Sequence, residues 1–268
     1  MKIQKTIFFT IASALCLSLS SCGDDEPEGN NNNGGGNGND DDQPSVIVPA
    51  DKMNTPDELL GKWEFSFPDE EGESESMVFT FKPNGIATMD QGDGYDAIGY
   101  CFATGNNLAI DFGAMKASGK YSVKGNQFQF SSRWSFLDDY DDEYTLKSNV
   151  STLNMTLYKL SDNYGFVPTK VANPIVGTWE RRVEGQEVHV FTFYKNGLFR
   201  YYQPESDDLD LIVAYSFYKV DGNKLTLLDS NGNPSYLLFY GQEADFSIDN
   251  GILSITFEGE TIYFNSTK

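Results

Sequence analysis

Histidine and cysteine are scarce in this sequence, which contains one histidine, His189, and three cysteines, Cys16, Cys22 and Cys101. Zinc sites are built from clustered His and Cys ligands, and Ser-His-Asp or Cys-His catalysis requires a histidine beside the nucleophile. His189 lies on a predicted strand two residues before Phe191, so we interpret it as an ordinary strand residue. The chain also has no Gly-x-Ser-x-Gly, P-loop or Gly-x-Gly-x-x-Gly motif. The sequence therefore predicts no enzyme, no cofactor and no metal.

Basic residues are few. Lys and Arg number 19 against 40 Asp and Glu, for a formal net charge of −21. Such a surface repels phosphate backbones, and only Arg181 and Arg182 are adjacent, so nucleic acid is not an expected partner. Cys101 has no second cysteine in a predicted folded region, and we interpret it as a small buried apolar residue.

Long segments with helical periodicity are absent as well. Tryptophan is rare, with three residues, whereas Tyr and Phe together number 35 (15 and 20). Because Tyr and Phe favour strands, this composition predicts an all-β protein.

The first residues have the pattern of an export signal. Met1–Lys5 is a short basic stretch, and Thr6–Leu19 is apolar but too short to serve as a membrane-spanning stop-transfer helix. The segment ends Leu19-Ser20-Ser21-Cys22, which resembles the lipoprotein box of bacterial signal peptides. The resemblance implies a signal peptide over 1–21, cleavage before Cys22, and lipidation of Cys22 by diacylglycerol and an acyl group such as palmitate. An ordinary secretory signal is the alternative.

Residues 22–54 follow as the lipidated cysteine and a tether. Gly23–Ala50 is rich in Asn, Gly and Asp and has no Lys or Arg, so it predicts a disordered chain with a root-mean-square reach of roughly 30 Å. The acidic Asp24-Asp25-Glu26 resembles the export signal of surface lipoproteins in some Gram-negative anaerobes. This resemblance implies a membrane partner through the Cys22 lipids, at the cell surface on the outer membrane.

One unit occurs twice after the tether. Phe79-Thr80-Phe81-Lys82-Pro83-Asn84-Gly85 returns 112 residues later as the stretch 191–197, and Gly-x-Trp-Glu occurs at 61–64 and 177–180. Alternation places the two Phe of each stretch on one sheet face and the Thr on the other.

Local turn chemistry supplies further expectations. Pro83 suits a type I turn with Gly85 in the left-handed region, and a two-residue Asn-Gly hairpin is the competing interpretation. Before the first repeat, Thr55-Pro56-Asp57-Glu58 has the pattern of a capping box that opens one helical turn. Asn173-Pro174 is an abbreviated version of it.

Short strands and Gly/Asn turns continue through each repeat, at about eight or nine strands per copy. Sequential hairpins of this kind predict an antiparallel meander that closes into an up-and-down barrel. We therefore expect two tandem antiparallel up-and-down β-barrels, at 55–162 and 173–268, joined by a linker at 163–172.

The helical turn, the Gly-x-Trp strand and the meander together resemble the lipocalin superfamily, and more narrowly the small lipocalin-like modules of bacterial surface lipoproteins. The resemblance implies that Trp63 and Trp179 plug the closed end of each barrel beneath a basic residue from the last strand. Lys159 and Lys268 occupy the matching places in this sequence.

Two kinds of ligand site are predicted. Inward aromatic residues of the second repeat, Phe191, Phe193, Tyr201 and Phe217, are candidates to line a narrow pocket for a small apolar or amphipathic ligand, the first repeat being the more nearly filled. The alternative is a glycan- or protein-binding module with solid barrels, in which Trp134 and Tyr140 bind from a loop. The acidic runs at 138–143 and 206–210 could ligate Ca²⁺ in principle, but they lack EF-hand spacing and are interpreted as solvated loops.

Overall fold

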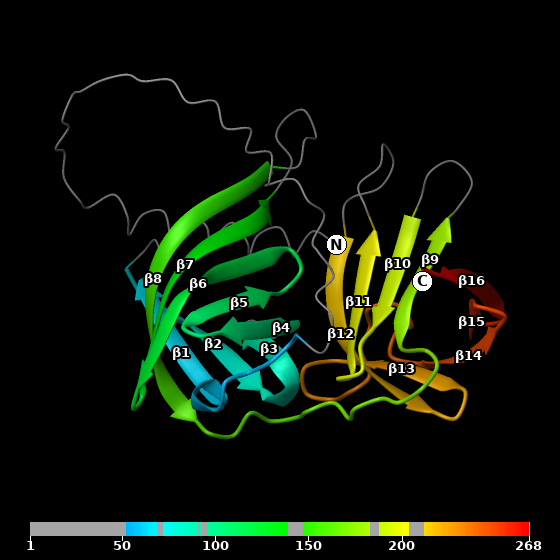
Figure 1. The fold of residues 1–268 in the computed structure, drawn as a ribbon, viewed down its shortest axis with the longest axis horizontal. Coiled ribbons are helices and arrows are strands. Elements are labelled where there is room, and N and C mark those ends of the chain that lie inside the picture. The colour runs from blue at the N-terminus through cyan, green and yellow to red at the C-terminus, as the bar shows by residue number, and fades with distance from the viewer. Residues whose placement is uncertain are drawn as a thin grey trace, which may run out of the picture. The chain divides into compact units, whose positions relative to one another are not determined.

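The computed structural model describes residues 52–68, 72–90, 92, 96–138, 147–182, 188–203 and 212–267. Sixteen strands in this part of the chain form two closed antiparallel barrels in tandem, with eight strands in each (Figure 1). Except for 67–75, the described residues of both barrels belong to one compact unit. The prediction of two tandem antiparallel barrels is thus confirmed.

The first barrel contains eight strands and two 3₁₀ turns: η1 (Asp57–Leu59), β1 (Gly61–Pro68), β2 (Ser74–Lys82), η2 (Pro83–Gly85), β3 (Ile86–Asp90), β4 (Asp96–Thr104), β5 (Asn107–Asp111), β6 (Met115–Lys124), β7 (Gln127–Asp138) and β8 (Lys147–Ser161). Neighbouring strands in the chain are neighbours in the barrel. β8 closes the barrel by pairing with β1, where Trp63 lies opposite Lys159.

The second barrel repeats this order with β9 (Gly177–Arg182), β10 (Val188–Phe193), β11 (Leu198–Gln203), β12 (Ile212–Asp221), β13 (Lys224–Leu228), β14 (Glu243–Asp249), β15 (Ile252–Phe257) and β16 (Glu260–Ser266). It closes where β16 pairs with β9 and Ser266 lies opposite Trp179. Among the described residues, no helix is both long enough and apolar enough to cross a membrane.

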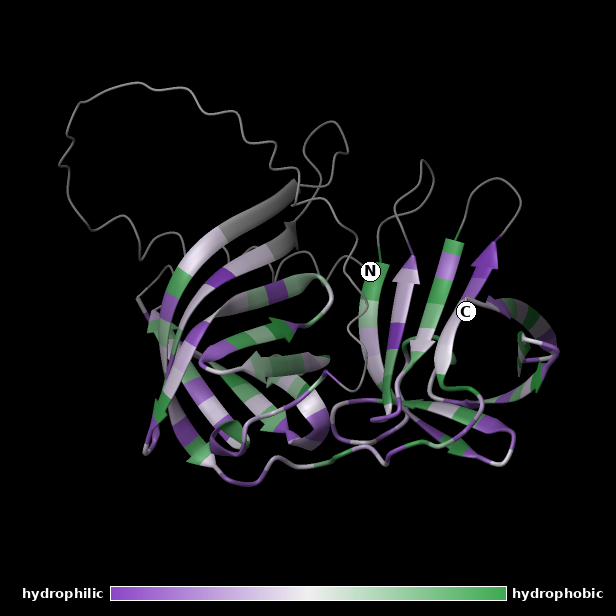
Figure 2. Ribbon diagram, viewed as in Figure 1, coloured by the Kyte–Doolittle hydropathy of each residue, from purple (hydrophilic) through white to green (hydrophobic). Residues whose placement is uncertain are grey.

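Alternation along the strands directs aromatic residues into the barrels, and Figure 2 shows apolar and polar positions alternating along several strands. On β2, Phe79 and Phe81 face inward and are buried. Phe81 packs edge-on against Phe128, with ring centroids 5.8 Å apart. In the second barrel the rings of Phe191 and Phe264 lie 4.4 Å apart. Aromatic side chains therefore occupy the interior of both barrels.

The two Gly-x-Trp strands make the same contact. Trp63 Nε1 donates a hydrogen bond to Leu59 O at 2.7 Å, and Trp179 Nε1 donates to Ile175 O at 2.8 Å. Each indole thereby ties the turn before the strand to the barrel core. Lys159 Nζ lies 5.2 Å from the centroid of the Trp63 ring, which is within the range of a cation–π interaction.

The two hairpin turns differ although their sequences are similar. In the first, Asn84 has φ 65° and Gly85 has φ 71°, so both residues are left-handed. Lys82 pairs with Ile86, however, so the turn has the three residues 83–85 and is not the two-residue Asn-Gly hairpin. In the second turn Gly197 is left-handed at φ 84°, and Gly197 N donates to Tyr194 O at 3.1 Å. This second copy has the geometry expected of a type I turn followed by a left-handed glycine.

The predicted capping box is wrong. Pro56 is the N-cap of η1, and no side chain caps the turn. Thr55 Oγ1 donates instead to Lys82 O at 2.6 Å, while Glu58 Oε1 accepts a hydrogen bond from Tyr121 OH at 3.1 Å. Both residues of the expected box make tertiary contacts, which override the local pattern.

The segment before η1 is attached to both barrels. Asn54 makes a reciprocal pair of hydrogen bonds with the backbone of Ala103 on β4, at 2.6 and 3.2 Å. Asn196, in the turn between β10 and β11, donates to Met53 Sδ at 3.4 Å and to Asn84 O at 3.1 Å. The two equivalent hairpin turns therefore touch each other beside this segment.

Strand β12 is buried on both faces. Tyr218 points into the second barrel with the other core rings, whereas Tyr215 and Phe217 point outward and are nevertheless buried. Tyr215 packs edge-on against Tyr100 of β4, with ring centroids 5.9 Å apart. The outward face of β12 is thus covered by the first barrel.

Candidate functional site

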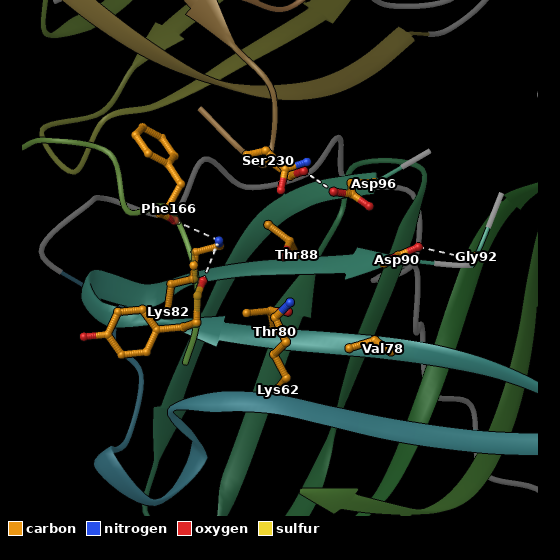
Figure 3. Close-up of a pocket in the computed structure, with 13 residues that line it drawn as sticks. Lys62, Val78, Thr80, Lys82, Thr88, Asp90, Gly92, Asp96, Phe166 and Ser230 are labelled. Carbon is orange, nitrogen blue, oxygen red and sulfur yellow. Dashed lines mark hydrogen bonds between the residues drawn. The ribbon is translucent and has the colours of Figure 1, made fainter. Parts of the chain in front are cut away.

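A groove of about 410 Å³ lies on the outer face of the first barrel. Strands β1 to β4, the segment after β8 and the loop after β13 form its walls (Figure 3). Its lining residues are Lys62, Val78, Thr80, Lys82, Thr88, Asp90, Gly92, Asp96, Tyr164, Gly165, Phe166, Ser230 and Asn231. Most of these are polar, in contrast to the aromatic barrel interiors.

Lys82 lies at one end of the groove and is only 3% exposed. Its ammonium donates hydrogen bonds of 2.8 Å to Tyr164 O and to Phe166 O (Figure 3). Burial, together with the positive charge of Lys62, lowers the pKa of the Lys82 amine from 10.5 to about 8, and Asp96 opposes this shift. Lys82 is therefore still mainly protonated at neutral pH. Keeping this buried ammonium charged costs free energy, and a bound anion would reduce that cost.

Two threonine hydroxyls lie beside this lysine. Thr80 on β2 and Thr88 on β3 are register partners, and alternation turns both away from the barrel core and into the groove. Both side chains are buried. Neither has a hydrogen-bond partner among the residues that the structure describes. Each hydroxyl can donate one hydrogen bond and accept others.

The opposite end of the groove is acidic. Asp90 Oδ1 accepts a hydrogen bond from Gly92 N at 2.8 Å, and Asp96 Oδ2 accepts one from Ser230 Oγ (Figure 3). A carboxylate has about four acceptor positions, so both groups retain capacity for a ligand's donors. The groove therefore has a cationic end and an acidic end.

The corresponding surface of the second barrel contains a large residue where the groove has a small one. Thr80 pairs with Thr88 in the first barrel, and Thr192 pairs with Arg200 in the second. Arg200 is 3% exposed and lies over the ring of Tyr202, 4.9 Å from its centroid. The outer face of the second barrel thus accommodates a long side chain at this register position. The small Thr88 instead leaves space for the groove on the outer face of the first barrel.

A second polar cluster lies in the second barrel, at the end where β11 finishes and β10 begins. His189 Nδ1 lies 2.9 Å from Tyr201 OH, which donates to Gln203 Oε1 at 2.6 Å. Beneath this cluster, the Tyr201 ring packs edge-on against Phe191, with centroids 5.5 Å apart. Here a polar group borders an aromatic core.

Three of the four predicted lining residues lie in the core of the second barrel. Phe191, Phe193 and Tyr201 are buried there together. The prediction that Phe217 lines the interior is wrong. Its ring points outward and packs against Phe166 at a centroid distance of 5.9 Å. The neighbouring Tyr218 takes the inward place, and its hydroxyl donates to Tyr194 O at 2.8 Å.

The prediction for Trp134 as a loop-borne binding residue is also wrong. It was expected to bind from a loop, but it lies on β7, is buried, and packs against Phe79 and Phe130 with centroids 6.3 Å away in each case. Tyr140 and Cys22 lie outside the described residues, as do Lys268 and the acidic run at 206–210. Of the run at 138–143, only Asp138 is described, as the last residue of β7.

Sequence reasoning missed the groove because Lys82, Thr80 and Thr88 occupy positions that alternation predicts to be solvent-facing. The covering segments come from residues 164–166 and 230–231, far away in the sequence. Cys101 is buried as expected, and burial raises the pKa of its thiol to about 12. Within the described ranges, no three His, Cys, Asp or Glu side chains come together as a metal site.

Within the part of the chain that the structure describes, the groove and the His189 cluster are candidate sites. Their chemistry is inferred from the contacts within this chain alone, because no known protein offers a comparison. No protein-family model, no curated protein and no solved structure matches the sequence or the fold.

Proposed function

We propose that this protein is a lipid-anchored, non-enzymatic binding protein whose two solid barrels support a groove for a small hydroxylated ligand of the carbohydrate class. The observation that carries the proposal is the groove itself: Lys82, Thr80 and Thr88 converge there with their polar groups available. Its volume of about 410 Å³ falls within the range of about 300–1,000 Å³ that is typical of small-molecule sites.

The filled interiors support binding outside the barrels. An eight-stranded barrel can hold either packed side chains or one small ligand. In the first barrel Phe81, Phe128 and Phe130 are almost fully buried and contact one another through Phe128, at centroid distances of 5.8 Å. This packing supports a ligand site on the outer face of the barrel.

The chemistry of the described residues supports a binding role rather than catalysis. A reactive cysteine needs a lowered pKa, whereas burial raises the pKa of the Cys101 thiol to about 12. The His189 imidazole is hydrogen-bonded to the phenol of Tyr201. The lipid anchor rests on Leu19-Ser20-Ser21-Cys22, which lies outside the described residues.

Calorimetric titration of the purified full chain with neutral and acidic monosaccharides tests the proposal. Thr88→Met places an uncharged, unbranched side chain in the groove and should abolish binding. Thr152→Met is the matched control, because Thr152 is an exposed residue on β8 of the same barrel. Absence of binding by every sugar, or equal binding by both variants, would refute the groove as the site.

A second candidate function is the binding of a small amphipathic ligand by the second barrel. It is favoured by the hydrogen-bonded His189, Tyr201 and Gln203 beside the aromatic core. A fluorescent fatty-acid probe should then bind weakly, and Gln203→Trp, which narrows this end, should remove the binding. Unchanged binding by Gln203→Trp would exclude this site.

A further inference from the structure

The cationic end of the groove has an unused donor. The protonated Lys82 amine carries three N–H groups, and two of them donate to Tyr164 O and Phe166 O. Within the described part of the chain, the third N–H has no partner. Because Lys82 lines the groove and its side chain is almost fully buried, a ligand in the groove could accept this hydrogen bond.

A second ammonium increases the attraction for an anion. Lys62, on β1, lines the same groove and is close enough to Lys82 for the two positive charges to repel each other. A carboxylate between them would relieve this repulsion and accept a charge-assisted hydrogen bond from Lys82. The protein as a whole carries a formal charge of −21, so this local pair of cations is opposite in sign to the net charge.

The remaining lining groups suit hydroxyls. Thr80 and Thr88 offer unpaired hydroxyls between the two ends, and Asp90 and Asp96 offer acceptors at the far end. A ligand with a carboxylate at one side and several hydroxyls at the other would use all of these groups. A neutral sugar would leave the two ammonium groups without an anion.

We infer that the groove is selective for a small acidic sugar of the uronic acid class, with its carboxylate between Lys62 and Lys82 and its hydroxyls toward Asp90 and Asp96. This inference rests on the proposed function, because it names the ligand class of the same groove.

Titration of the full chain with glucuronate, its methyl ester and glucose tests the charge assignment. A hydrogen bond to a charged group contributes about 1.5–3 kcal/mol, so the neutral ester and glucose should bind about ten- to hundredfold more weakly than glucuronate. Lys82→Met should weaken the binding of glucuronate by the same factor. Lys124→Met, at an exposed position on β6, should leave it unchanged.

The outcomes separate the two proposals. Equal affinity for glucuronate and glucose, removed by Thr88→Met, would overturn the acidic-sugar inference and leave the groove as a sugar site. Binding of an amino acid such as glutamate in preference to glucuronate would also overturn it, because the acidic end would then be taking an ammonium group. Binding of none of these ligands would refute the proposed function as well.

Discussion

Replacing Trp63 by alanine should destabilise the first barrel more than almost any other single truncation in it. The indole is fully buried, with an exposed fraction of 0%. It packs edge-on against Phe128 at a centroid distance of 5.7 Å, and its Nε1 donates to Leu59 O at 2.7 Å. The variant therefore removes packing, an aromatic pair and the tie between η1 and the core.

The expected magnitude follows from these contacts. Truncation of a buried Trp to Ala typically costs about 3–5 kcal/mol in unfolding free energy. Trp63→Phe isolates one part of that loss, because it retains much of the ring while leaving Leu59 O buried without its donor, which costs about 1–3 kcal/mol. The alanine variant should thus lose more stability than the phenylalanine variant.

Urea unfolding followed by far-ultraviolet circular dichroism measures both losses. Tyr158→Ala is the control, because Tyr158 on β8 is 54% exposed and its truncation should change stability by no more than about 0.5 kcal/mol. Trp179→Ala should behave like Trp63→Ala, since it breaks the equivalent hydrogen bond. If Trp63→Ala unfolds at the same urea concentration as Tyr158→Ala, the indole does not support the barrel and the reasoning fails.

Three further predictions concern the anchor, a glycine and the groove. Cys22→Ser should move the protein from the membrane to the soluble fraction, which cell fractionation would detect; retention in the membrane would refute lipidation there. Gly61 has φ 120° and a Cβ would collide with Ser161 O, so Gly61→Ala should lower the midpoint of urea unfolding, whereas an unchanged midpoint would contradict the close approach. Because the Lys82 amine releases its proton at about 8 when folded and near 10.5 when unfolded, the unfolding free energy of the wild type should rise relative to Lys82→Met between pH 8 and pH 10. A difference that stays constant across this range would show that the folded pKa is not lowered.

The barrel architecture was predictable because its signals are local. The alternation of Phe and Thr in Phe79-Thr80-Phe81 indicates which face of the strand is inward, and the matching stretch at 191–193 has the same alternation. Strand β12 shows where alternation fails. Its sequence, Ile212 to Tyr218, is apolar or aromatic at nearly every position, which is typical of a strand buried on both faces. That run was the available signal that Phe217 is covered from outside.

The groove was not predictable from the sequence. A lysine on the outward face of a strand is expected to be solvated. Lys82 is buried because residues 164–166 lie over it, and no local pattern indicates that packing. The size of the groove also depends on Thr88 in one barrel occupying the position that Arg200 holds in the other. This comparison becomes possible only when the strand registers are known.

The contacts of Met53 and Asn54 have a mechanical consequence. A force that reaches the barrels through the preceding chain enters at these two residues. Asn54 passes it to Ala103 of the first barrel through two hydrogen bonds, and Met53 passes it to Asn196 of the second. The load is therefore shared between the two barrels at its point of entry, so that tension applied through the chain before Met53 does not act on the first barrel alone.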